Sequence, residues 1–369
     1  LYKTSSATLN GGCSGASCWP AKRAVASSTT GDFLDKEWMD VGQSGSNTVV
    51  WVTWTRFTAT ASPIEASRCT ADLSSCTSPI PISASNAAAQ FSYVTIAPNG
   101  KVYVTWIEAS SGLGGEVFTL KMRVAAAGST TFGGVITLAT ETQPLGFNTS
   151  LADNDFRIVS IPQNTVLDMG TTNRVYVVWP FCQQAILVGT CRDSDIKIAY
   201  TDNDGSSFTT TTLTAPGNQY FPGIDADNSG GRIYLTYYSN RLDPWNHRQQ
   251  VVLAHAPPDL SSFSFIDLNP VFARGDLNCD GTFNVIDIIR ALQDLAAITP
   301  LPLNCPNDLN EPDADPFLGG LFIGDYIEVF AHNNLAVIGY NANFTLLNYL
   351  GTGPATYQQD NYLAKFTYP

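Results

Sequence analysis

The stretch Gly217–Pro244, GNQYFPGIDADNSGGRIYLTYYSNRLDP, contains the pattern on which the chain is built. It predicts a β-hairpin, because an apolar strand runs into Asp225-Ala-Asp227, the turn residues Asn228-Ser-Gly-Gly231 follow, and the strand Ile233–Tyr237 alternates after them. Variants of this second strand occur four more times in the sequence: Val50–Trp54, Val102–Trp106, Val175–Trp179 and Ala336–Tyr340. A unit that returns so regularly is a structural repeat, and its period of two is that of a strand.

The aromatic residues that end these strands lie roughly 50 to 70 residues apart, with a longer interval before the last one. That period, with several strands in each unit, is typical of β-propeller blades and too long for leucine-rich or ankyrin repeats. We therefore expect an all-β chain: a β-propeller with five recognisable four-stranded blades plus an N-terminal half-blade, in a ring of the six-bladed type. The predicted boundaries are residues 1–273 for the half-blade and blades one to four, 274–320 for a small α-helical insertion, and 321–369 for the last blade.

The composition fits an extracellular all-β protein. Only 14% of the 369 residues are charged, and the net charge is −13. Such an acidic chain excludes a broad nucleic-acid-binding surface and electrostatic adhesion to anionic membranes. No run of about 18 apolar residues occurs, so we expect no membrane span. Because Leu1 is neither an initiator Met nor part of a signal-peptide pattern, we expect a processed chain that is secreted or held at the cell surface.

Eight cysteines fall into four close pairs. None has the two-plus-two spacing of a zinc site, so we predict four disulfides and an oxidising compartment. The predicted disulfides join Cys13 to Cys18, Cys69 to Cys76, Cys182 to Cys191, and Cys279 to Cys305. The sequons at Asn148 and Asn343 are compatible with a secreted glycoprotein.

Residues 201–208, Thr-Asp-Asn-Asp-Gly-Ser-Ser-Phe, match the pattern Ser/Thr-x-Asp/Asn-x-Gly-x-Ser/Thr-aromatic. We expect Asn203 to cap the backbone of its own turn and Gly205 to take a positive φ, while Phe208 packs beneath the blade. The pattern is a folding device, so its main role is structural.

This turn and three further motifs resemble the Asp-box (BNR) repeats of sialidase-like propeller proteins. The further motifs are Asp35–Trp38, Tyr220–Asp225 with Tyr238–Pro244 after it, and Ile323–Tyr326. The resemblance covers all of the chain but the insertion, and it implies a propeller that recognises or cleaves glycans. The Arg-Ile-Pro motif expected near the start of a catalytic sialidase is absent, which favours recognition over hydrolysis.

Residues 276–287 place oxygen-bearing side chains at the positions of an EF-hand calcium loop, with Gly281 at position six. The predicted Ca²⁺ ligands are Asp276, Asn278, Asp280, Thr282, Asn284 and Asp287. A predicted helix at residues 285–297 follows, so the segment resembles one half of a dockerin. We favour a Ca²⁺ ion that stabilises this inserted surface segment, with cohesin docking as the alternative. A second acidic site near Asp308–Asp315 stays open.

In a propeller, the starts of inner strands and the ends of second strands meet at one mouth of the central channel. That geometry predicts a glycan site at this mouth. The candidate catalytic residues are Asp35, Glu37, Glu108 and Tyr326, and the candidate ligand-binding residues are Arg56, Arg157, Arg241 and Asp325. Three arginines from three blades could clamp a carboxylate ligand, as in a sialidase. The competing interpretation is that these charges pair with one another at the rim.

Three functions follow. The leading one is a calcium-binding, sialidase-like propeller that recognises a glycan or glycoprotein, with Trp and Tyr side chains stacking on sugars. The first alternative is an exo-glycosidase. The second is a structural subunit of an extracellular filament, because the N-terminal half-blade could close its own ring or pair with the next molecule.

Overall fold

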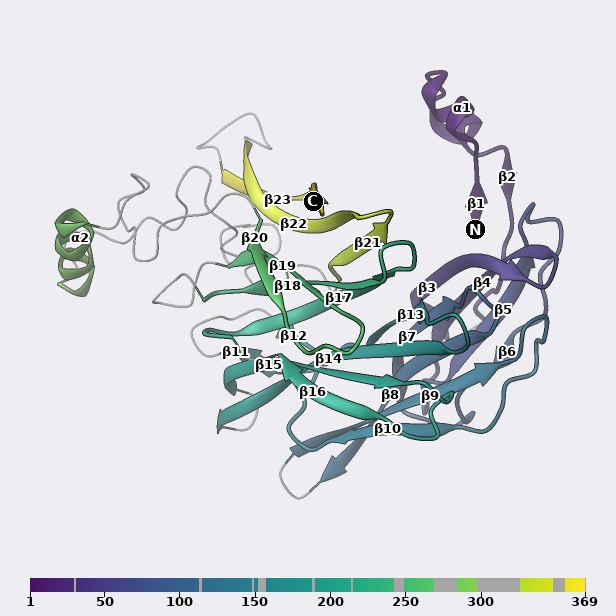
Figure 1. The fold of residues 1–369 in the computed structure, drawn as a ribbon, viewed down its shortest axis with the longest axis horizontal. Coiled ribbons are helices and arrows are strands. Elements are labelled where there is room, and N and C mark those ends of the chain that lie inside the picture. Colours follow the sequence, from purple (N-terminus) through teal and green to yellow (C-terminus); the bar gives the residue numbers. More distant parts are fainter. Residues whose placement is uncertain are drawn as a thin grey trace.

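The computed structural model describes residues 1–29, 31–112, 115–147, 149–151, 157–187, 190–213, 215–241, 249–268, 284–296, 326–347 and 356–368. Within these ranges the strands form five consecutive, mainly antiparallel sheets that fan out side by side (Figure 1). Their innermost strands contact one another in chain order. The predicted all-β propeller of five blades is confirmed.

Among the described residues, blades one, two and four each contain four strands, blade three contains four and two short additional strands, and blade five contains three. Blade one consists of β3 (Phe33–Ser44), β4 (Asn47–Phe57), β5 (Ile64–Thr70) and β6 (Ile80–Pro81). Blade two consists of β7 (Ala89–Ile96), β8 (Val102–Gly112), β9 (Gly115–Ala125) and β10 (Ile136–Glu141). Blade three consists of β13 (Gln163–Asp168), β14 (Asn173–Leu187), β15 (Thr190–Thr201) and β16 (Thr209–Leu213). Blade four consists of β17 (Gln219–Asp227), β18 (Arg232–Ser239), β19 (Gln250–Ala256) and β20 (Ser264–Asp267). Blade five consists of β21 (Glu328–His332), β22 (Leu335–Leu347) and β23 (Thr356–Thr367).

A few short elements accompany the blades. At the N-terminus, β1 (Tyr2–Lys3) and β2 (Ala21–Lys22) flank α1 (Ser6–Asn10) and a 3₁₀ turn at Gly15–Cys18. In blade three, β11 (Thr149–Leu151) pairs with β12 (Arg157–Ile158) and adds to the edge of β15 in parallel. The helix predicted after the calcium loop is α2 (Val285–Leu295).

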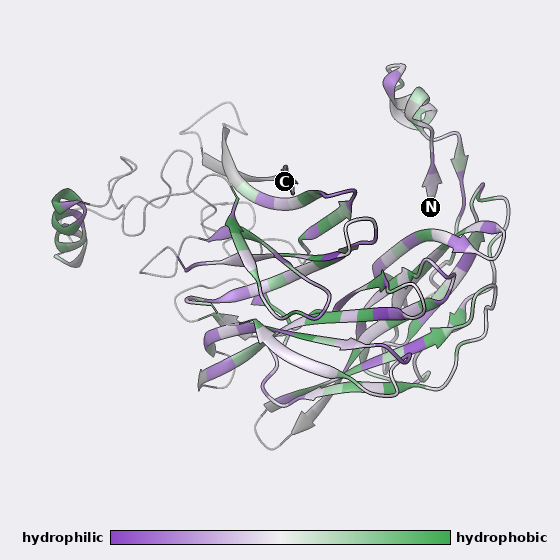
Figure 2. Cartoon of the chain, viewed as in Figure 1, coloured by the Kyte–Doolittle hydropathy of each residue, from purple (hydrophilic) through white to green (hydrophobic). Residues whose placement is uncertain are grey.

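The core lies between the blades. The five aromatic residues that mark the repeat are all buried: Trp54, Trp106, Trp179, Tyr237 and Tyr340. Apolar residues lie in bands along the strands, separated by polar ones (Figure 2). Blades two, three and four thus bury both faces of their inner strands against neighbouring blades, as expected for stacked sheets.

The hairpin of the opening stretch forms as predicted. β17 pairs with β18 from Gln219↔Ser239 to Asp227↔Arg232, and Gly231 takes a φ of 62° in the turn. The Asp227 carboxylate accepts the amide of Ser229 at 3.0 Å within that turn. The turn is therefore fixed by its own side chain, in the manner of an Asx turn.

The N-terminal segment packs on blade one. Leu1, Val25 and Ala26 contact the apolar face of β4 that carries Val50 and Val52. The strands β1 and β2 pair only with each other among the described residues, so they add no fourth strand to blade five. This two-stranded ribbon lies beside blade one and apart from β23 (Figure 1).

Three of the four predicted disulfides form: Cys13–Cys18, Cys69–Cys76 and Cys182–Cys191. The fourth predicted disulfide joins Cys279 to Cys305. Both residues lie outside the described part of the chain. The pairing of Cys279 with Cys305 therefore stays a prediction.

The turn at residues 201–208 has the predicted geometry. Asn203 accepts the Ser207 amide at 3.0 Å, and Gly205 takes a φ of 90°.

The sequence also predicted that the chain has no membrane span. No helix in the described part of the chain is long and apolar enough to cross one.

Candidate functional site

The strand register defines one position that recurs in every blade. There, a residue of the inner strand pairs with the residue just before the buried aromatic anchor of the second strand. We call these residues the first ring: Trp38, Tyr93, Gln163, Gly223 and Glu328. Residues two positions further along lie on the same face of each strand. We call these the second ring: Asp40, Thr95, Thr165, Asp225 and Phe330.

The second ring links each blade to the next. Asp40 accepts the amide of Ile96 in β7 at 2.6 Å, and Asp225 accepts the amide of Ala331 in β21 at 2.8 Å. The two threonines of the ring also bond to the backbone of the following blade: Thr165 accepts the amide of Ala226, and Thr95 donates to the carbonyl of Asn164. These buried carboxyls therefore stabilise the packing of adjacent blades, since they satisfy backbone donors that water cannot reach.

Phe330 is the exception in the second ring, because no following blade covers it. Its side chain is 63% exposed, and Leu363 on the same sheet face is 79% exposed. On blade one, Met39 and Val41 are also about half exposed. The inner strands are therefore packed against each other except between blade five and blade one.

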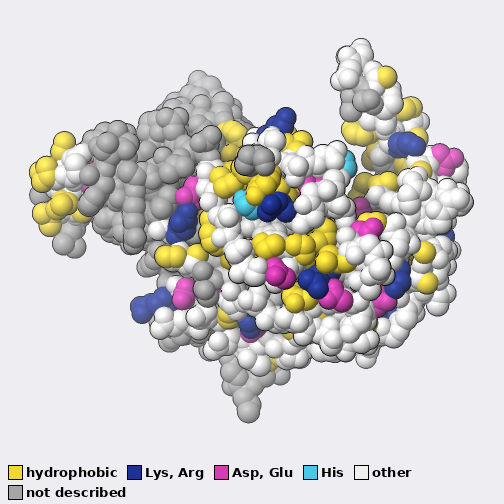
Figure 3. Space-filling model, viewed as in Figure 1, with side chains coloured by type: hydrophobic (Ala, Val, Ile, Leu, Met, Phe, Trp, Pro, Cys, Tyr) yellow, Lys and Arg dark blue, Asp and Glu magenta, His cyan; other side chains and the backbone are white. Residues whose placement is uncertain are grey.

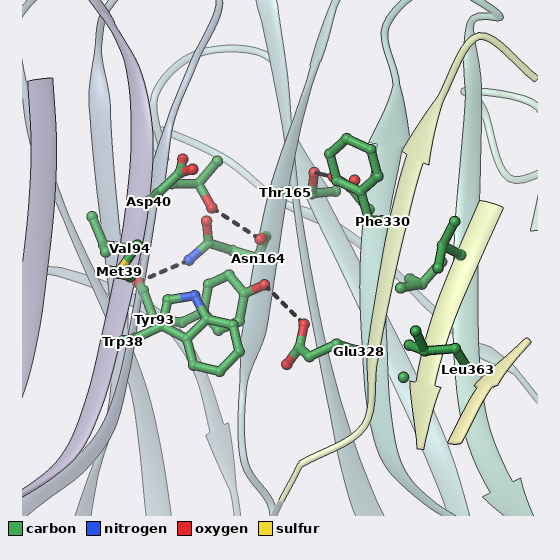
Figure 4. Close-up of a pocket in the computed structure, with 15 residues that line it drawn as sticks. Trp38, Met39, Asp40, Tyr93, Val94, Asn164, Thr165, Glu328, Phe330 and Leu363 are labelled. Carbon is green, nitrogen blue, oxygen red and sulfur yellow. Dashed lines mark hydrogen bonds between the residues drawn. The ribbon is translucent and has the colours of Figure 1, made fainter. Parts of the chain in front are cut away.

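A cavity of 460 Å³ lies between the inner strands and reaches the exposed sheet face of blade five. The inner strands of all five blades contribute to its wall, together with β22 and β23. Figure 4 shows Trp38, Tyr93 and Glu328 at this wall, with Asn164 and Asp40 nearby. The cavity thus brings together residues that lie far apart in the sequence, such as Trp38 and Glu328.

Glu328 is the most strongly perturbed acid of the cavity. Its carboxyl accepts hydrogen bonds from the Gln163 side-chain amide at 2.7 Å and from the Tyr93 hydroxyl at 3.4 Å. Burial raises the pKa of Glu328 to about 8, and the nearby charge of Asp225 adds to the shift. The group is therefore a neutral carboxylic acid at pH 7, and it can donate a proton.

The other two acids of the cavity are also shifted. Burial raises the pKa of Asp225 to about 6 and raises that of Asp40 above its ordinary value. Both shifts are opposed by the backbone amides that bond to these carboxylates. Glu328 and Asp225 thus differ in their preferred protonation state, which is the arrangement that acid–base chemistry requires.

Aromatic rings cover one side of the cavity. Trp38 stacks on Tyr93 with ring centroids 4.3 Å apart, and Tyr326 lies against Trp38 at 5.6 Å. Tyr326, one of the predicted site residues, thus contacts the cavity wall without lining the cavity itself. A flat aromatic wall beside carboxyl groups can bind a ligand that has both an apolar face and polar edges.

The predicted arginines do not line this cavity. Arg56 pairs with Asp32 at 2.6 Å and with Glu65 at 2.9 Å, and Arg241 pairs with Asp267. Arg157 lies in β12 at the edge of blade three. Arg56 and Arg241 therefore pair with neighbouring carboxylates, as the competing interpretation of the sequence had it.

The predicted acids also lie elsewhere. Glu108 pairs with Lys121 at 3.1 Å and accepts the Trp106 indole N–H at 3.0 Å. Asp35 and Glu37 precede the cavity residues in β3, beside a break in the strand register. Asp325 lies outside the described residues. The roles assigned to these residues remain predictions.

The sequence analysis missed Asp40, Asp225 and Glu328, although a signal for them exists. Each is an acidic residue flanked by apolar residues in the first strand of a repeat. Trp38, Tyr93 and Glu328 precede the aromatic anchors of their repeats by 16, 13 and 12 residues, so only an alignment that also allows for hairpin turns of different length places them in register. An acid at a position that is aromatic in other copies of a repeat is unusual in a buried strand.

The predicted calcium loop is mostly outside the described residues, which include only Asn284 and Asp287 of its six ligands. These two residues form a capping box at the start of α2. Asn284 accepts the amide of Ile286 at 2.8 Å, and Asp287 accepts the amide of Asn284 at 2.7 Å. Such a cap is found at the start of many helices, and the Ca²⁺ ion stays a prediction.

The two predicted glycosylation sites are not tested by the structure. Asn148 lies outside the described residues, and Asn343 lies within β22.

We compared the sequence with known families and proteins, and the fold with solved structures. No family model matches the sequence, and no curated protein matches it. The α-L-arabinofuranosidase of Fusarium graminearum is 10% identical, with 89% of this chain and 92% of that chain covered, at a TM-score of 0.45. The α-L-arabinanase of Penicillium chrysogenum is 10% identical over 88% and 92%, also at 0.45. Levansucrase from Bacillus subtilis is 11% identical over 90% and 84%, at 0.41. At these identities and TM-scores the likeness carries no argument about chemistry.

Proposed function

We propose that this protein binds a glycan in its central cavity. The observation that carries the proposal is a stacked aromatic wall, Trp38 on Tyr93, beside three carboxyl groups in one cavity. Sugar rings have apolar faces that pack on aromatic rings, and hydroxyl groups that bond to carboxyl oxygens. The volume of 460 Å³ is in the usual range for small-ligand sites, roughly 300 to 1,000 Å³.

Titration of the protein with neutral and acidic oligosaccharides tests this function. We expect saturable binding, followed by calorimetry, and roughly tenfold weaker binding by Trp38→Ala, equivalent to ~1.4 kcal/mol. Trp19→Ala is the matched control, because Trp19 is 43% exposed in the N-terminal segment away from the cavity. If no oligosaccharide binds, or if both tryptophan variants behave alike, the proposal is wrong.

Glycoside hydrolysis is the second candidate, and the protonation of Glu328 favours it. A neutral carboxylic acid can protonate the leaving oxygen of a glycosidic bond, while an ionised carboxylate such as Asp225 assists on the other side of the sugar. Release of reducing ends from a bound glycan would support this function, and Glu328→Gln would abolish that release. Binding without any release would leave the protein as a glycan receptor.

Two further proposals are a structural role in a filament and a bound Ca²⁺ ion. Native mass tests the first, and melting with and without a chelator tests the second. Among the described residues β23 pairs only with β22, so its outer edge and the β1–β2 ribbon are the surfaces that a filament would use, while the capping box of α2 supports a Ca²⁺ loop. We expect light scattering to give the molar mass of a monomer, 39.7 kDa. We also expect the α2 segment to melt at a lower temperature after chelation of Ca²⁺. An open-ended assembly would instead support the filament, and indifference to the chelator would remove the Ca²⁺ ion.

The three disulfides fit an oxidising, extracellular location. Together with the net charge of −13, they support a secreted protein whose partner is a glycan or glycoprotein.

A further inference from the structure

We propose that the ligand of the central cavity carries a positively charged amino group, so that the glycan it takes is an amino sugar with a free amine. The inference rests on the glycan function proposed above, and it names the class of sugar.

The charge of the cavity wall is the first reason. Of the fifteen lining residues, Asp40, Asp225 and Glu328 carry carboxyl groups, and none is Lys, Arg or His. These carboxyls accept hydrogen bonds from neutral donors, namely backbone amides and the side chains of Gln163 and Tyr93 among others. A sialic acid or uronic acid would add a negative charge to this wall at a large electrostatic cost, whereas an ammonium group would neutralise it.

An unpaired acceptor at the wall is the second reason. Asn164 is 1% exposed, and its amide nitrogen donates to the Tyr93 carbonyl at 3.0 Å and to the Thr105 hydroxyl at 2.8 Å. Its Oδ1 atom has no hydrogen-bond partner. A buried acceptor without a donor is costly, so a ligand that brings donors gains free energy here. An ammonium group has three donors and no acceptor, which matches a wall rich in acceptors.

The aromatic wall is the third reason. A cation is attracted to the face of a tryptophan or tyrosine ring within about 6 Å of the ring centre. Trp38 and Tyr93 lie in the same cavity wall as Glu328 (Figure 4). Aromatic rings combined with carboxyl groups are the usual components of sites for organic ammonium ions. A neutral sugar would use the rings but leave the excess of negative charge uncompensated.

Cation binding should also change the proton count of the protein. The groups facing Glu328 are Tyr93 of β7, Gln163 of β13 and Asp225 of β17, none of them cationic. Burial keeps Glu328 protonated at pH 7. A positive charge placed beside it favours the carboxylate, so ligand binding at pH 7 releases up to one proton from Glu328 to the buffer.

The experiment compares the fully deacetylated glucosamine tetramer with the N-acetylglucosamine tetramer by calorimetry at pH 6, where the amine is charged. We expect the amine form to bind at least tenfold more tightly. Repeating the titration at pH 7 in two buffers of different ionisation heat measures proton release. Glu328→Gln should remove that release and most of the preference for the amine. Glu108→Gln is the matched control, because Glu108 lies outside the cavity and pairs with Lys121.

The outcomes separate the two proposals. Equal or tighter binding of the N-acetylated tetramer, or of a sialylated sugar, overturns the inference and leaves the glycan function standing. Binding of choline with no binding of any sugar supports a cation site and ends the glycan function. If neither a sugar nor choline binds, both proposals are wrong.

Figure 3 shows the outer surface in the same orientation as Figure 1, where Lys and Arg side chains lie interspersed with Asp and Glu side chains. The whole chain is also acidic, with a net charge of −13, but the fifteen residues of the cavity wall differ from the surface in Figure 3 in that none of them is Lys, Arg or His. A screen with choline and with sialylated sugars tests that local charge directly.

Discussion

The Glu328→Gln variant is expected to exceed the wild-type protein in stability at alkaline pH, by up to ~5 kcal/mol in the free energy of unfolding. Burial raises the pKa of this carboxyl from 4.5 to about 8 in the folded protein. An acid with a raised folded pKa contributes its full stability below its unfolded pKa and loses it as the pH rises toward the folded value. The wild-type protein should therefore weaken between about pH 4.5 and pH 8, whereas a glutamine stays neutral throughout.

Urea denaturation at pH 5, 7 and 9 measures the effect. At pH 5 the two proteins should be similar, because both side chains are neutral, and the difference should be nearly complete at pH 9. Asp225 also loses stability as it ionises, since its pKa is about 6, but this loss is common to both proteins. Glu108→Gln again serves as the control. Parallel pH profiles for the wild-type and Glu328→Gln proteins would contradict the burial of Glu328 as a neutral acid.

The fold was predictable because its signals are local. The turn residues Asn228–Gly231 and the alternating strand after them specify a hairpin without reference to the rest of the chain. Recurrence of that strand then specifies a repeat, and cysteines a few residues apart specify loops that a disulfide can close. The more widely spaced Cys279 and Cys305 lie outside the described residues, so their pairing is not confirmed. None of these inferences needs knowledge of which blade packs against which.

The site was not predictable in the same way, because bulges shift the strands. In blades one, two and four the register breaks near the start of the inner strand. A residue at each break has a positive φ: Lys36 at 57°, Phe91 at 55° and Phe221 at 49°. A bulge moves all following side chains to the other face of the strand. Alternation counted from the strand start therefore points to Asp35 and Glu37, whereas the cavity receives Trp38 and Asp40.

Long-range contacts decide the rest. Glu328 meets Gln163 and Tyr93 only because blades two, three and five share one centre. No window of the sequence contains that information. The arginines Arg56 and Arg241 were predicted to meet, but each has a carboxylate close by in its own blade, and a local ion pair costs less chain entropy than a distant one.

Asp227→Ala is expected to destabilise the protein by about 3 kcal/mol, because the backbone amides of two turns lose a buried acceptor at once. Asp227 is fully buried. Its carboxylate accepts the Ser229 amide at 3.0 Å in its own turn, and the amides of Asn333 and Asn334 in blade five at 3.1 and 2.7 Å. Asn333 and Asn334 have φ values of 51° and 60°, so these bonds also hold a left-handed turn.

The side chain of Asp259 provides a matched control, because it accepts the Ser261 amide at 3.1 Å in an equivalent turn but contacts no following blade in the described residues. Asp259→Ala should therefore cost less than about 1 kcal/mol. Asp227→Asn keeps one acceptor and should fall between the two alanine variants.

The pH dependence separates the bonds of Asp227 from the packing of its side chain. Burial opposes the ionisation of Asp227, but the backbone amides outweigh burial and lower its pKa. The stability it contributes is thus present above its unfolded pKa of 3.8 and lost as the pH falls below that value. Urea denaturation at pH 7 and pH 3 should show the difference between Asp227→Ala and the wild-type protein shrinking in acid. If Asp227→Ala and Asp259→Ala lose equal stability at pH 7, the bonds between blades four and five contribute nothing, and the turn alone accounts for the effect.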